Sequence, residues 1–209
     1  MKEPQLAREQ SMSDGRNSVS GATRTVGGVT EQGYSAPLKR AILSYEHQQR
    51  QEKNEAMAFY DDEGNLLSRK EGKRDRVEIN KEDVPRENLI MTHNHPSALS
   101  ESGYMRIGNS FSMEDAIMAV RHKAKEVRAV TPTYTFSIKR KGDKWGVTQA
   151  AVRRAYEKAI NQVATQGQSY SDRIGFSQTV NNRYTVTFWH KVNKLVAKEL
   201  GWDYSKKRG

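Results

Sequence analysis

The stretch MTHNHPSALS, residues 91–100, places two histidines two positions apart at the end of an apolar run and follows them with a proline. The residues just before them, 88–92, read as a short buried strand. Side chains at positions i and i+2 of a strand point to the same side, so we expect His93 and His95 to converge on one point. This geometry suits a metal ion, but a pair of histidines alone does not establish one.

A third ligand is available at the start of the next helical pattern. Ser112 and Asp115 form the sequence S-x-x-D, which is typical of a helix capping box with Ser112 as the N-cap. A cap and a metal site can coexist, because a helix N-terminus at a strand end presents a carboxylate and a hydroxyl to the same space. Asp115 would then be a ligand, and Ser112 would hydrogen-bond a metal-bound water.

Two imidazoles and one carboxylate leave a fourth zinc position for water, which is the open arrangement of a catalytic site. Zinc lowers the pKa of such a water to about 7. A general base is still needed to move its proton. Glu55, which opens the strand pattern EAMAFY, is the candidate; Glu46 and Glu52 are less well placed because they fall on the preceding polar helix. An iron site of two histidines and one carboxylate is the alternative for the metal.

Four segments together resemble the JAB/MPN fold with its JAMM metal motif, above all RadC-type bacterial proteins and the related modules of phage and mobile-element proteins. The segments are Glu55 with the strand and D-x-x-G-N turn after it, THNHPS at 92–97, FSMEDAIMAV at 111–120 and AVTPTYTFSI at 129–138. The resemblance covers roughly residues 50–147. It implies that His93, His95 and Asp115 bind zinc, that Ser112 steadies the water or the oxyanion, and that Glu55 acts as general acid and base.

One feature departs from that family. Ser112 follows His95 by 17 positions, whereas the serine of typical members follows the second histidine more closely. The connecting loop, 97–111, therefore carries an insertion. We expect it to overhang the site and to affect substrate access, while each ligand keeps its own strand or helix.

The pattern of elements predicts an α+β fold, a small mixed sheet flanked by helices, because strands and helices mix without a regular βαβ alternation. A polar helix should begin near residue 38, with Leu38, Ile42 and Tyr45 on its apolar side. Ile117, Val120, Ala124 and Val127 step by three or four and predict a second amphipathic helix. The remaining expected elements are a hairpin of 56–60 with 66–67, a strand at 74–80, a solvent-faced strand pair within 128–145 turning at Gly142-Asp143, and helices at 148–165 and 185–201, the last capped by Gly201.

The length and composition bound the domain organisation. A chain of 209 residues is one domain or one and a half. Only 35% of it is apolar, and the first 40 residues hold few large apolar side chains, so they cannot offset their ordering entropy. We predict a disordered basic tail at 1–37, a JAB/MPN-like metal-binding domain at 38–147 and a helical extension at 148–209.

The same composition limits the partners. Cysteine is absent, which excludes disulfides and thiolate ligands. No apolar run is long enough to span a membrane and no secretory signal is visible, so we expect no membrane contact and a cytoplasmic location, in a bacterial host or on a virion. The favoured function is a zinc-dependent metallopeptidase or isopeptidase acting on a peptide or protein substrate.

The charge keeps a second function open. The net charge of +10 and the pI near 9.7 favour an acidic partner such as nucleic acid. The alternative is therefore a nucleic-acid-associated or phage accessory protein with a RadC-like domain and no peptidase activity. Its candidate contacts are the basic residues of the last two helices: Arg153, Arg154, Lys158, Lys191, Lys194 and Lys198.

Overall fold

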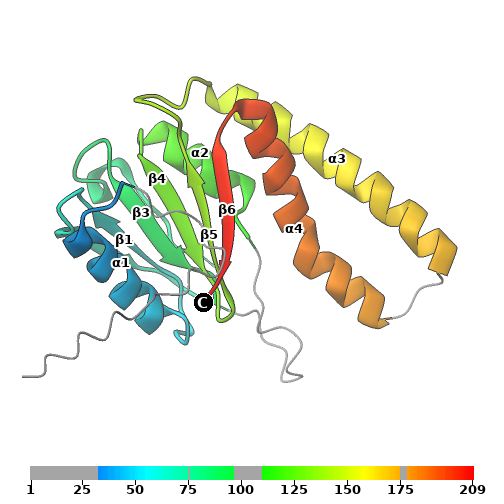
Figure 1. The fold of residues 1–209 in the computed structure, drawn as a ribbon, viewed down its shortest axis with the longest axis horizontal. Coiled ribbons are helices and arrows are strands. Elements are labelled where there is room, and N and C mark those ends of the chain that lie inside the picture. Colours follow the sequence, from blue (N-terminus) through cyan, green and yellow to red (C-terminus); the bar gives the residue numbers. More distant parts are fainter. Residues whose placement is uncertain (1–32, 75, 97–109, 175–177) are drawn as a thin grey trace, which may run out of the picture.

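The computed structural model describes residues 33–74, 76–96, 110–174 and 178–209 (Figure 1). Within these ranges the chain forms four α-helices and one six-stranded mixed sheet. The predicted α+β class, a mixed sheet flanked by helices, is confirmed. The predicted disorder of the tail concerns residues 1–32, which lie outside the described ranges.

The sheet has the strand order β2-β1-β3-β4-β5-β6. Only β3 and β4 pair in parallel; every other neighbouring pair is antiparallel. A parallel pair needs a crossover connection, and the chain between β3 and β4 supplies it with a helix. The strands are β1 (Ala56–Tyr60), β2 (Leu66–Glu71), β3 (Ile90–Asn94), β4 (Glu126–Val130), β5 (Tyr134–Lys139) and β6 (Asp203–Arg208).

Helices cover both faces of the sheet (Figure 1). Helix α1 (Ala36–Gln49) packs Leu38 and Ile42 on one face, against alternate residues of β1 and β3. Helices α2 (Met113–Arg121), α3 (Gln149–Ile174) and α4 (Gln178–Leu200) belong to the larger core on the other face. Because both faces are covered, β1, β3 and β4 are buried along their whole length.

The first helix is confirmed and begins within the range predicted for the tail. Ser35 is its N-cap and accepts a hydrogen bond from the Leu38 N–H. Tyr34, one residue earlier, donates a hydrogen bond to Glu126 on β4. The boundary predicted at residue 37 therefore lies inside an ordered helix, because a polar N-cap and one aromatic side chain suffice to attach this segment to the sheet.

The second helix is confirmed at its start, but the prediction that it continues to Val127 is wrong. Helix α2 ends at Arg121, and Lys123 has a φ of +51°, which turns the chain back toward the sheet. Ala124 and Val127 are buried, but Ala124 lies in the turn and Val127 in β4. Both residues face the same core as Ile117. Their spacing in the sequence matches that of a helix because all three are buried, although the backbone is helical only at Ile117.

Two predicted strand features are wrong. Within the described residues, 76–80 form no strand and lead into a short 3₁₀ turn, η1 (Lys81–Asp83), because they find no ladder partner next to β2. The strand pair at 128–145 exists as β4 and β5. The turn between these strands, however, lies at 131–133 rather than at Gly142-Asp143. The strand pair is buried by helices on both faces of the sheet, so it does not face solvent as predicted.

The last two helices are confirmed, and each packs a stripe of apolar side chains against the core. Val152, Tyr156 and Ala159 of α3 and Val192 and Val196 of α4 are buried. Gly201, with a φ of +71°, ends α4 as a left-handed cap. Residues 203–208 then form β6, which the sequence did not predict, and this strand pairs with β5 at the edge of the sheet.

Candidate metal centre

The two histidines stand at the carboxyl end of β3, on the sheet face that carries the larger core. His93 is the fourth residue of the strand, and the His95 N–H donates to the Val130 carbonyl at 2.7 Å, which extends the pairing with β4. Their Nε2 atoms are 2.9 Å apart. His93 is 1% exposed, whereas His95 is half-buried. The predicted convergence of the pair is therefore present.

Helix α2 brings Asp115 to the same point. One carboxylate oxygen, Oδ1, lies 3.3 Å from Nε2 of His93, and the other, Oδ2, lies 3.6 Å from Nε2 of His95. The predicted capping box is formed: the Ser112 hydroxyl accepts a hydrogen bond from the Asp115 N–H, and the carboxylate accepts one from the Ser112 N–H at 2.7 Å. The first turn of the helix thus fixes the carboxylate beside the histidines.

The Ser112 hydroxyl also donates to Oδ2 of Asp115 at 2.9 Å. Its hydrogen atom is therefore directed at the carboxylate in this structure. The serine therefore orients the Asp115 carboxylate. A role toward water or an oxyanion requires its hydroxyl to turn away from Asp115.

Glu55 reaches the site through the pairing of β1 with β3. The register sets Met57 opposite His93, so two residues further along the antiparallel pair Glu55 falls opposite His95. Oε1 of Glu55 lies 3.6 Å from Nε2 of His95. Glu55 is 8% exposed, so it faces the site rather than bulk solvent.

Asn94, which the sequence analysis did not single out, holds the start of β1 against β3. Its side chain accepts from the Ala56 N–H at 2.7 Å and donates to the Asn54 carbonyl at 2.9 Å. These two bonds bracket Glu55 and fix its backbone. Asn94 lies between the two histidines, so its side chain points to the opposite side of the strand. A polar residue on that side of a buried strand was the signal in the sequence for a supporting role.

The donor atoms lie close enough to one another to share a cation. Zinc bonds of about 2.0–2.1 Å place tetrahedral ligand atoms about 3.3–3.4 Å apart. The two Nε2 atoms are closer than this, at 2.9 Å, and Asp115 approaches them with different oxygens, Oδ1 at 3.3 Å from His93 and Oδ2 at 3.6 Å from His95. Glu55, His93 and His95 also offer ligand atoms that all lie within 4.8 Å of one another. A group of this composition can hold a metal ion.

The Asp115 carboxylate supplies the negative charge of the site. Burial raises the pKa of Asp115, but the charges and hydrogen bonds of His93 and His95 outweigh it and hold that pKa well below its ordinary value. Asp115 is therefore a carboxylate at neutral pH. Two Nε2 atoms 2.9 Å apart need a proton or a cation between them. The buried Nδ1 of His93 has no hydrogen-bond partner among the described residues.

The two alternative bases lie elsewhere. Glu46 is on α1, across the sheet from the histidines, where it pairs with Arg128 at 2.6 Å and accepts from Thr92. Glu52 is exposed in the turn after α1. Of the three carboxylates considered from the sequence, only Glu55 is brought to the histidines.

The C-terminal helices support the segment that precedes Ser112. Asn193 of α4, fully buried, donates to the Phe111 carbonyl at 2.9 Å and accepts from the Tyr156 hydroxyl of α3 at 2.5 Å. Ser110 hydrogen-bonds the Tyr204 hydroxyl of β6 at 2.9 Å. The loop expected to overhang the site, 97–111, is described only at residues 110 and 111, which are buried. No local sequence signal marks Asn193, because its partners are distant in the chain.

The six basic residues predicted for nucleic-acid contact divide into two groups. On α3, Arg153 pairs with Glu114 at 3.1 Å and Lys158 with Glu199 at 2.9 Å, while Arg154 is exposed. On α4, Lys194 and Lys198 line a pocket, and Lys191 is exposed nearby. Lys158 and Lys198 also line a smaller pocket between the two helices, and whether the six residues bind nucleic acid stays a prediction.

The remaining histidines do not join the metal centre. His47 is exposed on α1, and His122 caps the end of α2. His190 is half-buried against Tyr204, whose hydroxyl lies 2.9 Å from its Nδ1.

Comparison with protein-family models, with curated proteins and with solved structures finds no match to this chain. In the described part of the chain, none of the helices combines the length and the hydropathy needed to cross a membrane.

Proposed function

We propose that this protein is a zinc-dependent hydrolase of the JAMM type, built on a JAB/MPN-like domain, that cleaves a peptide or isopeptide bond. The observation that carries the proposal is the convergence of His93, His95, Asp115 and Glu55 at one end of the sheet. Two imidazoles and one carboxylate can bind zinc and leave its fourth position for water, and a second carboxylate lies beside them. The resemblance of the sequence to the JAMM pattern supports the same assignment.

The residues divide between binding and proton transfer. His93, His95 and Asp115 would hold the metal, and Ser112 keeps the Asp115 carboxylate in place. Bound zinc supplies Lewis-acid polarisation of a carbonyl and lowers the pKa of a coordinated water to about 7. Glu55 accepts the proton of the attacking water and delivers it to the leaving amine. Its low exposure keeps competing solvent away from that transfer.

The first test is metal content. Protein washed with a weak chelator and dialysed against zinc should carry about one zinc ion per chain by elemental analysis, and His93→Ala should carry almost none. His47→Ala is the matched control, because it removes an exposed histidine from α1 and leaves the site intact. Equal zinc in wild type and His93→Ala would contradict the site, and iron retained in preference to zinc would reassign the metal.

The second test separates proton transfer from metal binding. Glu55→Gln should keep the zinc and the fold but lose hydrolysis of fluorogenic peptides and of lysine-linked isopeptide conjugates, since the amide cannot accept a proton. Glu52→Gln, an exposed change nearby, should cut at the wild-type rate. Wild-type activity in Glu55→Gln would place the base elsewhere.

The alternative proposal is a nucleic-acid-associated accessory protein, of phage or mobile-element type, in which the domain has no peptidase activity. The net charge of +10 favours it. A protein that binds one zinc per chain but cleaves none of these substrates would favour this alternative, because a metal site can stabilise a fold without reacting.

A further inference from the structure

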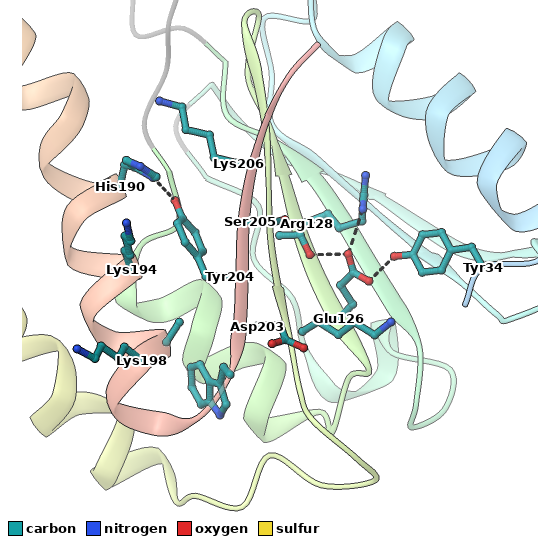
Figure 2. Close-up of a pocket in the computed structure, with 14 residues that line it drawn as sticks. Tyr34, Glu126, Arg128, His190, Lys194, Lys198, Asp203, Tyr204, Ser205 and Lys206 are labelled. Atoms are coloured by element: carbon teal, nitrogen blue, oxygen red, sulfur yellow. Dashed lines mark hydrogen bonds and ion pairs between the residues drawn. The ribbon is translucent and has the colours of Figure 1, made fainter. Parts of the chain in front are cut away.

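A basic groove lies between α4 and β6, and none of the predicted metal ligands lines it. It is the α4 side of a pocket of about 840 Å³ that extends around the edge strand. Figure 2 shows His190, Lys194 and Lys198 on α4, with Tyr204 and Lys206 of β6 directed to the same side, whereas Ser205 points to the other side of the strand. We call these five residues the α4–β6 groove.

The lysines of the groove have few negative neighbours. Among the described residues, no carboxylate forms an ion pair with Lys194, Lys198 or Lys206, and the neighbouring Asp203 pairs with Lys141 at 3.4 Å. Burial lowers the pKa of His190, and the charges of Lys206 and Lys194 lower it further. The side chains of α4 and β6 thus present three lysines that form no ion pair among the described residues.

The spacing of the two lysines of α4 suits a chain of phosphates. Lys194 and Lys198 are four residues apart, so they lie on one side of α4 and are separated by a rise of about 6 Å. This separation is comparable to that of successive phosphates along a nucleic-acid strand. Lys194 and Lys198 are exposed and free to reach them.

Aromatic rings line the same side of the sheet. Tyr204 and Tyr134 are half-buried, and the Lys206 ammonium lies 3.9 Å from the centre of the Tyr134 ring. The His190 ring is 5.5 Å from that of Tyr204. Partly exposed rings beside cations are the components with which proteins bind single strands, because unpaired bases can stack on the rings while lysines contact the phosphates. In a duplex the base faces are already stacked.

We propose that the α4–β6 groove binds the phosphate backbone of a single-stranded nucleic acid. Lys194 and Lys198 contact successive phosphates, and Lys206 contacts a third from the strand side. Arg153 and Lys158 of α3 take no part, because they already pair with carboxylates. The binding does not depend on hydrolysis at the metal centre.

The test is fluorescence anisotropy of the full chain with a labelled 20-nucleotide oligothymidylate at 50 and 200 mM salt. Three phosphate contacts on a single strand give a slope of log K against log salt of about −2, which is about a 20-fold loss of affinity over this range. Lys194→Gln/Lys198→Gln should reduce the loss to about threefold. Both positions are exposed, so circular dichroism and the melting temperature should match those of the wild type.

The control is Arg153→Gln/Lys158→Gln, which removes the same charge from α3 and should keep the wild-type slope. An equal loss of slope in the two double variants would overturn the proposal, because net charge and not the groove would then drive binding. Absence of salt-dependent binding by the wild type would also overturn it. So would tighter binding of a 20-base-pair duplex than of the single strand.

Discussion

Replacing Asn193 by alanine tests whether the C-terminal helices support the metal centre. Its amide group donates to the Phe111 and Trp189 carbonyls at 2.9 and 2.8 Å, and its oxygen accepts from the Tyr156 hydroxyl. Phe111 directly precedes Ser112, the N-cap of the helix that carries Asp115. Asn193 therefore links α3 and α4 to the backbone that positions one ligand.

The expected loss of stability follows from the groups left without partners. Asn193 and Tyr156 are fully buried. Alanine would leave the Tyr156 hydroxyl and the Phe111 carbonyl without this partner, and each unsatisfied buried group costs about 1–3 kcal/mol. The Trp189 carbonyl is less affected, because it keeps its place in the helix. We expect Asn193→Ala to lower the free energy of unfolding by about 2–6 kcal/mol.

Urea denaturation measures this loss, and competition with a zinc indicator measures its effect on the site. Zinc affinity should fall by about tenfold, the lower end of the range for residues that support metal ligands. Tyr156→Phe and the double variant complete a cycle, in which the coupling should be about 1 kcal/mol. An unfolding free energy within 0.5 kcal/mol of the wild type, about the scatter of a surface substitution, would refute the reasoning.

Three further outcomes are expected. Arg128→Met should destabilise the fold by about 3–5 kcal/mol in urea denaturation, because it leaves two buried glutamates without their shared cation; an unchanged midpoint would contradict this. Ser112→Ala should lower the free energy of unfolding by about 1 kcal/mol through loss of the helix cap, and it should reduce zinc affinity because Asp115 loses its hydroxyl donor. Unchanged zinc affinity in a competition assay would contradict this. Burial raises the pKa of Asp61, but hydrogen bonds from Asn65 and Gly64 in its turn outweigh this and hold the pKa below its ordinary value. The ionised Asp61 therefore stabilises the fold at neutral pH, and this stabilisation is lost as the pH falls through its lowered pKa. In Asp61→Asn, the free energy of unfolding should therefore fall less steeply when the pH is lowered into the acid range.

The local parts of the candidate site could be predicted from the sequence. The alternation of a strand sets His93 and His95 on one side, and S-x-x-D forms the cap that holds Asp115. Both relations span at most four residues, so they depend on backbone geometry that neighbours in the chain impose. The apolar side of α1 could be predicted for the same reason.

Local patterns misled where burial did not follow one period. Ala124 and Val127 fitted a helical stripe, but the chain reverses at Lys123 and enters β4. Residues 76–80 alternate as a strand does and remain unpaired among the described residues. Periodicity reports which side chains are buried, and a core can bury residues of a turn, a helix and a strand together.

The tertiary structure alone decided how distant segments meet. Glu55 faces His95 only because β1 pairs antiparallel with β3 in one register, and a shift of one residue would turn it to the other face. The polar segment 203–208 carries no strand signal of its own, yet it becomes β6 because the turn at Gly201 lays it along the open edge of β5. Hydrogen-bond ladders join residues far apart in the chain, so the sequence determined which side chains could bind a metal, and the sheet determined which carboxylate stands beside them.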